Sequence, residues 1–272
     1  MSDPYHIVGS ALISFSGGRT SGYMLHQILK AHEFRLPDDV RVCFANTGRE
    51  REETLRFVRE CESRWGVEIN WLEWRPGKPG FEVVGYNSAS RVGEPFEALI
   101  RSKQRLPNSH ERWCTQHLKV LPMFGYMRAA LNLEPGMYSE TIGLRDDEGR
   151  RILSGMERAE TDGRRVSYPL AKAKVRKSDV MEFWASAPFD LGIHGWEGNC
   201  DLCFLKGKGL RKRIIRDTPR VADWWAAMEH EQHGWFDKRD LVADLVANVD
   251  ASPEFDFDDE HETECGLNCE PV

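Results

Sequence analysis

Strand-like apolar runs alternate with amphipathic helical segments over the first 74 residues. The runs "ALISF" (11–15), "DVRVCFANTG" (39–48) and "VEINWLEW" (67–74) have the length and apolar character of buried strands. Between them, residues 22–29 and 52–65 place apolar side chains at helical spacing. The order strand, helix, strand, helix, strand favours parallel strands joined by crossover helices. The sequence therefore predicts an α/β fold with a doubly wound, mainly parallel sheet.

Two later runs extend the predicted sheet to five strands, namely "MYSETIGL" (137–144) and "RVSYPLA" (165–171). The intervening residues 75–107 are rich in Gly, Pro and Ser, which predicts loops with one short helix over 94–101. The C-terminal part is predicted to be helical over 177–187, 205–216, 220–230 and 238–249.

Composition and charge narrow the class of protein. With 40% hydrophobic and 30% charged residues, no apolar run of about 18 residues, and no signal-like N-terminus, we expect a cytoplasmic globular protein without a membrane partner. The net charge of −7 is unevenly spread. Residues 206–220 hold seven basic side chains and one acid, whereas residues 250–264 hold eight acids and no Lys or Arg. The basic stretch, Lys206 to Arg220, is either a solvated helix face or a contact for nucleic acid.

The hexapeptide Ser16-Gly17-Gly18-Arg19-Thr20-Ser21 lies where the first predicted strand gives way to the first helix. In open α/β sheets this carboxyl edge is where ligands bind. Glycines allow close backbone approach, hydroxyls donate, and a helix N-terminus presents N–H groups to an anion. The segment predicts an oxyanion cradle, with a simple tight turn as the alternative, and it matches neither common phosphate-binding glycine motif.

Six segments resemble a known family in the expected order. "SFSGGRTS" resembles the PP-loop of the ATP-pyrophosphatase superfamily, whose fold is Rossmann-like. The remaining segments are similar to its phosphoadenosine phosphosulfate reductase family: "CFANTGREREETLRFVREC", "RWCTQHLKVLPM", "IGLRDDEGRR", "NCDLCFLKG" and "TECGLNCE". The resemblance implies that an adenine nucleotide is bound by Ser16, Gly17, Gly18, Arg19, Thr20, Ser21, Asn46, Thr47, Gly48, Gly143 and Arg145.

We predict three regions: a PP-loop nucleotide-binding α/β domain over residues 1–175, a helical cysteine-bearing region over 176–249 packed on it, and an acidic, mobile, cysteine-containing tail over 250–272. Three positions depart from the family pattern. Thr20 stands where ATP-cleaving PP-loops usually carry an aspartate, Asn46 stands where relatives often have Asp, and Asn268 replaces the tail histidine. Without the aspartate, Mg²⁺ binding stays open, and we expect the loop to hold a sulfate or phosphate rather than to cleave ATP.

The seven cysteines point to thiol or metal chemistry, because an odd number in a reducing compartment does not suit a disulfide framework. Cys200 and Cys203 form a C-x-x-C pair, and Cys114 adds a third thiol from a distant segment. This set fits zinc or iron–sulfur chemistry, and the resemblance favours an iron–sulfur cluster of the 4Fe-4S type. Cys269 is our predicted fourth ligand, with Cys265 or no ligand as alternatives; an unligated dithiol is the alternative for the pair. Cys43 and Cys61 are predicted to pack in the core.

Cys265 is the predicted catalytic nucleophile, attacking the sulfur of an activated sulfate before an external thiol reductant such as thioredoxin completes the reaction. The leading hypothesis is a sulfonucleotide reductase that uses cysteine or iron–sulfur chemistry. The alternatives are an iron–sulfur-dependent sulfur transferase that adenylates and thiolates a nucleic acid, and a nucleotide-binding regulatory module without catalysis.

Overall fold

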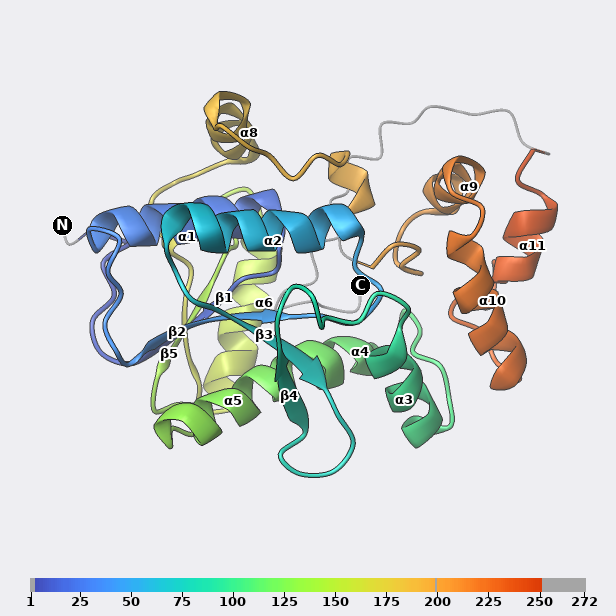
Figure 1. Cartoon of the computed structure of the whole chain (residues 1–272), viewed down its shortest axis with the longest axis horizontal. Coiled ribbons are helices and arrows are strands. Elements are labelled where there is room, and N and C mark those ends of the chain that lie inside the picture. Colours follow the sequence, from blue (N-terminus) through green and yellow to red (C-terminus); the bar gives the residue numbers. More distant parts are fainter. Residues whose placement is uncertain (1–2, 199, 251–272) are drawn as a thin grey trace.

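A six-stranded sheet forms the centre of the computed structural model, which describes residues 3–198 and 200–250 (Figure 1). The strand order is β4-β3-β2-β1-β5-β6. In chain order the strands are β1 (Ala11–Ser14), β2 (Val40–Ala45), β3 (Ile69–Trp74), β4 (Phe81–Val84), β5 (Ser139–Ile142) and β6 (Arg165–Ser167). Every neighbouring pair is parallel except β3 and β4, which are antiparallel.

The α/β, mainly parallel fold predicted from the sequence is therefore confirmed, and all five predicted strands are present. The predicted strand number was wrong, because β4 adds a sixth strand at the edge within the segment expected to be loops. Only Phe81 of β4 is buried. A short edge strand of this kind has neither the alternation nor the apolar run that identifies a strand in the sequence.

Helices cover both faces of the sheet (Figure 1). α1 (Arg19–Ala31), α2 (Glu52–Trp65) and α8 (Lys177–Ser186) lie on one side, and α5 (Leu121–Leu131) and α6 (Gly149–Thr161) lie on the other. The remaining helices are α3 (Glu94–Lys103), α4 (Trp113–Thr115), η1 (Gln116–Val120), α7 (Pro169–Lys172), η2 (Gly195–Glu197), α9 (Lys208–Asp217), α10 (Val221–Glu231) and α11 (Val242–Ala247). No helix in residues 3–198 and 200–250 is both long and apolar enough to cross a membrane.

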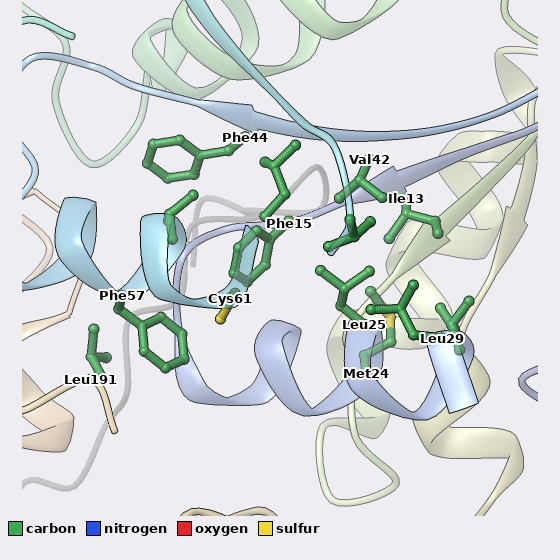
Figure 2. Packing of buried hydrophobic residues seen from close by; sticks show 14 of the residues in the cluster. Ile13, Phe15, Met24, Leu25, Leu29, Val42, Phe44, Phe57, Cys61 and Leu191 are labelled. Carbon is green, nitrogen blue, oxygen red and sulfur yellow. The ribbon is translucent and has the colours of Figure 1, made fainter. Parts of the chain in front are cut away.

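Alternating strand residues supply two separate cores. Ile13 and Phe15 pack with α1 and α2, as Figure 2 shows. Leu12 and Cys43 belong to the opposite cluster, which lies between the sheet and α5. The Cys61 sulfur lies inside the first cluster, so the prediction that Cys43 and Cys61 are core residues is confirmed. Burial raises the pKa of both thiols, which keeps them protonated and unreactive.

A third core joins α9, α10 and α11 to α3 and to the segment around Trp113. Phe96 of α3 lies at its centre and has ring contacts with Trp113, Trp225 and Phe236. The C-terminal helices are thereby attached to the segment that precedes β5, and this attachment positions the cysteine-bearing loop described below.

His26 connects α1 to surrounding aromatic rings and makes the stability pH-dependent. Its ring lies 5.3 Å from that of Trp65 and 4.9 Å from that of Phe183, and its buried Nδ1 has no hydrogen-bond partner among the described residues. Burial, together with Lys30, lowers the pKa of His26. Below about pH 6.5 the unfolded chain therefore binds a proton at His26 that the folded protein does not bind. The free energy of unfolding consequently decreases as the pH is lowered.

We expect His26→Phe to reduce this pH dependence. Urea unfolding at about pH 7.5 and about pH 5.5 measures it as the change in unfolding free energy between the two conditions. Because the side chain is partly exposed, the difference between the variant and the wild type is expected to stay below about 1 kcal/mol. An equal pH dependence in both proteins would assign the effect to other groups.

Candidate active site at the carboxyl edge of the sheet

Three loops meet at the carboxyl edge of neighbouring strands. The PP-loop, residues 16–21, follows β1, the turn at residues 46–48 follows β2, and residues 143–145 follow β5. Strand β1 pairs with β2 on one side and with β5 on the other. The strand order changes direction at β1, because the chain first adds strands on one side of it and later on the other. The carboxyl ends of the strands at such a position form a crevice in which ligands bind.

The PP-loop is a glycine-dependent turn into the first helix. Gly17 has a φ of 79°, and a Cβ at this position would lie 2.8 Å from Cγ2 of Thr54, so the loop has room only for glycine. The Ser21 hydroxyl accepts a hydrogen bond from the Ser16 N–H at 3.2 Å and donates to the Gly18 carbonyl at 3.0 Å. Among the described residues no side chain caps the N-terminus of α1, and its first turn contains no acid. This N-terminus therefore favours an anion.

Arg145 connects the loop after β5 to the PP-loop. Its Nη1 donates to the Thr20 hydroxyl at 2.8 Å, and its Nε donates to Asp147 at 3.0 Å. Gly143 allows this approach, because a Cβ there would lie 3.3 Å from the Ser21 Cα. Thr20, at the position where ATP-cleaving PP-loops usually carry an aspartate, is thus buried and accepts a hydrogen bond from Arg145.

Arg19 is held by a carboxylate from a distant part of the chain. Its Nε and Nη2 donate to the two oxygens of Asp190, at 2.7 Å and 2.5 Å. The Trp184 indole N–H of α8 also donates to the Arg19 carbonyl at 2.9 Å. The arginine at the start of α1 is therefore oriented by the segment that follows α8.

The turn after β2 is internally bonded. Asn46 is 0% exposed; its amide N–H groups donate to Glu73 at 2.7 Å and to the Ser90 carbonyl at 2.8 Å. Its Oδ1 accepts from the Gly48 N–H at 3.1 Å. The Asn46 side chain thus shapes the turn, so a ligand at this position would meet mainly main-chain groups and Thr47.

Cys114, Cys200 and Cys203 line one cavity of about 20 Å³, which we call the cysteine cavity. None of the three forms a disulfide within the described part of the chain. The other lining residues are Thr47, Phe96, Arg112, Thr115, Leu118, Lys119, Phe204, Leu205 and Trp225. The Thr47 hydroxyl lies 3.6 Å from the Cys200 sulfur. One residue of the predicted nucleotide turn therefore contacts the cysteine pair.

A continuous helical segment carries Cys114. α4 leads into the π-helical η1 and then into α5, and Lys119 of η1 lines the cavity with Cys114. Pro122 has no N–H to donate to the carbonyl four residues earlier, which accounts for a wide turn at this place. This segment is one of the helices that the sequence did not predict.

Lys206 organises the loop that carries Cys200 and Cys203. It is 3% exposed, and its Nζ donates to the Cys200 carbonyl at 2.7 Å and to the Gly198 carbonyl at 3.0 Å. Burial lowers the pKa of Lys206, and the neighbouring cysteines oppose this shift. Main-chain carbonyls of the loop that carries the cysteine pair thus surround the buried amine of Lys206.

The sequence prediction grouped Cys114 with Cys200 and Cys203, and the structure places these three around one cavity. Within residues 3–198 and 200–250, no three His, Cys, Asp or Glu side chains are arranged as a metal-binding group. The predicted nucleophile Cys265 and the predicted ligand Cys269 lie outside the described residues.

One segment of the chain matches a known protein family. Residues 10–86 match the phosphoadenosine phosphosulfate reductase domain. The match runs from just before β1 to just after β4, so it contains the PP-loop and the turn after β2. It contains none of the three cysteines of the cavity.

Two relatives extend the comparison beyond residues 10–86. An uncharacterized nin region protein of Escherichia phage lambda is 30% identical over 203 residues, 72% of this chain and 66% of that protein. An uncharacterized protein of Methanocaldococcus jannaschii is 25% identical over 247 residues, 84% of this chain and 44% of that protein. The chain thus spans just under two thirds of the first and less than half of the second. No solved structure is significantly similar to it.

The basic stretch, Lys206 to Arg220, is partly internal. Lys206, Arg211 and Lys212 are buried, and Lys208 pairs with Asp240 at 2.5 Å. Arg211 pairs with Asp237 at 3.0 Å. Fewer than the seven charges counted in the sequence are therefore available for phosphate contacts.

Sequence reasoning did not identify Glu50 or Asp190 as site residues. Asp190 binds Arg19 across 171 positions, and no sequence pattern links the two. Glu50 lies inside the segment that resembles the family, but its burial beneath Thr47 and its ion pair with Lys119 depend on the tertiary fold.

Proposed function

We propose that this protein is a phosphoadenosine phosphosulfate reductase-like enzyme that binds an adenine nucleotide at the PP-loop and uses cysteine thiols for sulfur chemistry. The observation that supports this best is the position of Thr47. It belongs to the turn after β2, and its hydroxyl lies 3.6 Å from the Cys200 sulfur. A nucleotide held at this edge of the sheet would be bound next to the cysteine cavity.

The negatively charged sulfate or phosphate of the nucleotide would be held by hydrogen-bond donors and positive charges. At the PP-loop these are the N–H groups at the N-terminus of α1, the hydroxyls of Ser16 and Ser21, and the guanidinium of Arg145. Arg19, fixed by Asp190, adds a second positive charge. Arginine and helix N–H groups together are a common anion-binding combination.

In the proposed reaction a cysteine thiolate, Cys265 in our assignment, attacks the sulfur of phosphoadenosine phosphosulfate. The bond between this sulfur and the bridging phosphate oxygen breaks, and adenosine 3′,5′-bisphosphate leaves with the electron pair. A second thiolate then attacks the cysteine sulfur of the resulting thiosulfonate, so sulfite leaves and a disulfide remains. The two thiols are oxidised by two electrons, and a thiol reductant of the thioredoxin kind restores them.

An iron–sulfur cluster is a further part of the proposal, and its support is that three cysteines from two segments line one cavity. Cys114, Cys200 and Cys203 would hold such a cluster, with Cys269 as the proposed fourth ligand. Bound there, a cluster would supply soft, thiolate-ligated iron next to Thr47.

The same three thiols favour a second candidate function, an iron–sulfur-dependent sulfur transferase that adenylates and thiolates a nucleic acid. Adenylation would need ATP and Mg²⁺ at the PP-loop, where Thr20 accepts a hydrogen bond from Arg145. It would also need phosphate contacts from the exposed part of residues 206–220.

Titration calorimetry with phosphoadenosine phosphosulfate and with ATP, followed by assays of sulfite release with a thiol reductant, tests the proposal. We expect tighter binding of phosphoadenosine phosphosulfate and sulfite release that Cys265→Ser abolishes without loss of binding. Cys61→Ala, which changes a core thiol, serves as the control that keeps activity. AMP formation from ATP that requires RNA or DNA would instead establish the transferase, and tight binding without turnover would establish a regulatory module.

Iron and sulfide analysis after anaerobic purification tests the cluster separately. We expect several iron atoms per chain and broad absorbance near about 400 nm, both lost in Cys200→Ser. Wild-type protein without iron or sulfide would remove the cluster from the proposal while leaving the thiol reaction in place.

A further inference from the structure

Residues 49–51 form a seam against the loop that carries Cys200, residues 197–201. Glu50 and Cys200 form an antiparallel backbone bridge, and the Asp201 N–H donates to the Arg49 carbonyl at 2.9 Å. Arg51 pairs with Glu197 at 2.9 Å, and Arg49 pairs with Asp201. Three consecutive residues thus tie the end of the nucleotide turn to the cysteine loop, across about 150 positions of sequence.

Glu50, in the middle of the seam, is buried. The residue is 6% exposed. Its Oε1 accepts a hydrogen bond from the Thr47 hydroxyl at 3.2 Å and pairs with the Lys119 Nζ at 3.4 Å. Its Oε2 is buried without a hydrogen-bond partner among the described residues. A buried carboxylate with one unsatisfied oxygen destabilises a fold, so packing alone does not account for it.

Both partners of Glu50 belong to the cysteine cavity. Thr47 and Lys119 line it, and the Thr47 hydroxyl approaches the Cys200 sulfur at 3.6 Å. Thr47 comes from the turn after β2, whereas Lys119 comes from η1. The carboxylate of Glu50 therefore links the turn after β2 to η1 at the cysteine cavity.

We infer that Glu50 is a positioning residue of the cysteine site, which orients Thr47 against the Cys200 sulfur, holds Lys119 at the same cavity and keeps that thiol turned toward the nucleotide turn. Its backbone bridge holds the Cys200 main chain, and its carboxylate holds Thr47, which contacts the sulfur, and Lys119, which lines the same cavity. The part of this inference that concerns turnover rests on the proposed function. The part that concerns the Cys200 environment does not.

Site-resolved alkylation with iodoacetamide tests the positioning. Each cysteine is followed by peptide mass spectrometry in the intact protein, treated with a chelator so that any metal is removed. We expect Glu50→Ala to speed alkylation of Cys200 about tenfold, because the loop opens more often. Glu50→Gln should give a smaller increase, about threefold, since its amide oxygen can still accept from Thr47. Partial rescue by Gln is specific to an orienting role.

Cys43 and Cys61 act as internal standards. Both are 0% exposed and react only when the α/β core unfolds, so their rates report global stability. Glu60→Gln is the matched control, because it removes a surface carboxylate that pairs with Arg64 on α2, at 3.1 Å. We expect wild-type alkylation rates at Cys200 and Cys43 in this control, and Cys61 is left out because the Glu60 charge raises its pKa.

Unchanged Cys200 alkylation in both Glu50 variants would overturn the inference, and so would a parallel rise at Cys43 and Cys61. If Glu50→Ala does not fold, Glu50→Gln decides alone. In the sulfite-release assay we expect Glu50→Gln to lower kcat by a larger factor than it raises KM for phosphoadenosine phosphosulfate, because Glu50 holds the Cys200 main chain and its Gln substitute can still accept from Thr47. If the wild-type protein releases no sulfite, the proposed function is refuted. The alkylation rates would still test whether Glu50 positions the Cys200 thiol.

Discussion

Replacing Gly17 by alanine is expected to destabilise the protein by about 2–4 kcal/mol and to abolish nucleotide binding at the PP-loop. The left-handed φ of 79° disfavours alanine, and its methyl group would lie 2.8 Å from Thr54 and 3.0 Å from Phe44. Relief requires either movement of these buried side chains or a change in the loop. Since the loop presents the N-terminus of α1 to the ligand, its distortion removes the oxyanion cradle.

Urea unfolding and titration calorimetry with phosphoadenosine phosphosulfate measure the two effects of Gly17→Ala. Gly209→Ala in α9 is the matched control, because Gly209 lies inside a helix with open space around its Cα. Gly209 is the second residue of α9, so we expect a gain from helix propensity of less than about 0.5 kcal/mol and unchanged binding. Wild-type affinity in folded Gly17→Ala protein would show that the nucleotide binds elsewhere.

The parallel strands were predictable because their signal is local. The run "ALISF" is apolar on both faces, as a strand covered by helices on both sides requires, and residues 11–14 are all buried. α2 begins and ends where its helical spacing predicts, at Glu52 and Trp65. Local patterns of this kind need no knowledge of the partner segment.

The parts that were missed depend on tertiary context. β4 is a four-residue edge strand between two glycines, Gly80 and Gly85, and most of it is not buried. The helix from Trp113 to Leu131 is interrupted by a π-helical turn before Pro122, so its apolar residues do not keep a 3.6-residue period. In both segments the local sequence signal is weak.

For the site, the sequence predicted residue types and the structure supplied their partners. The C-x-x-C pair and Cys114 could be grouped by motif, and they line one cavity. The contact between Thr47 and Cys200 spans 153 positions and could not be predicted, because it depends on how the C-terminal helices pack against α3. The same packing brings Glu50 to the cysteine loop.

Lys206→Met is expected to destabilise the cysteine loop by about 2–3 kcal/mol, the second large effect. Methionine fills a similar volume but leaves the carbonyls of Gly198 and Cys200 without the donor that now lies 3.0 Å and 2.7 Å away. Because the lysine is 3% exposed, water cannot easily replace its amine. The loss should appear as faster hydrogen exchange in residues 200–206, together with a lower urea midpoint.

Lys208→Met supplies the comparison that separates burial from charge. It removes the same charge two residues later, from a side chain that is 58% exposed and pairs with Asp240 at 2.5 Å. A surface ion pair of this kind contributes less than about 1 kcal/mol, so exchange in the cysteine loop should stay at the wild-type rate. If both variants lose the same stability, the loop depends on net positive charge near the thiols. If only Lys206→Met loosens it, the buried amine holds the loop through its carbonyl contacts.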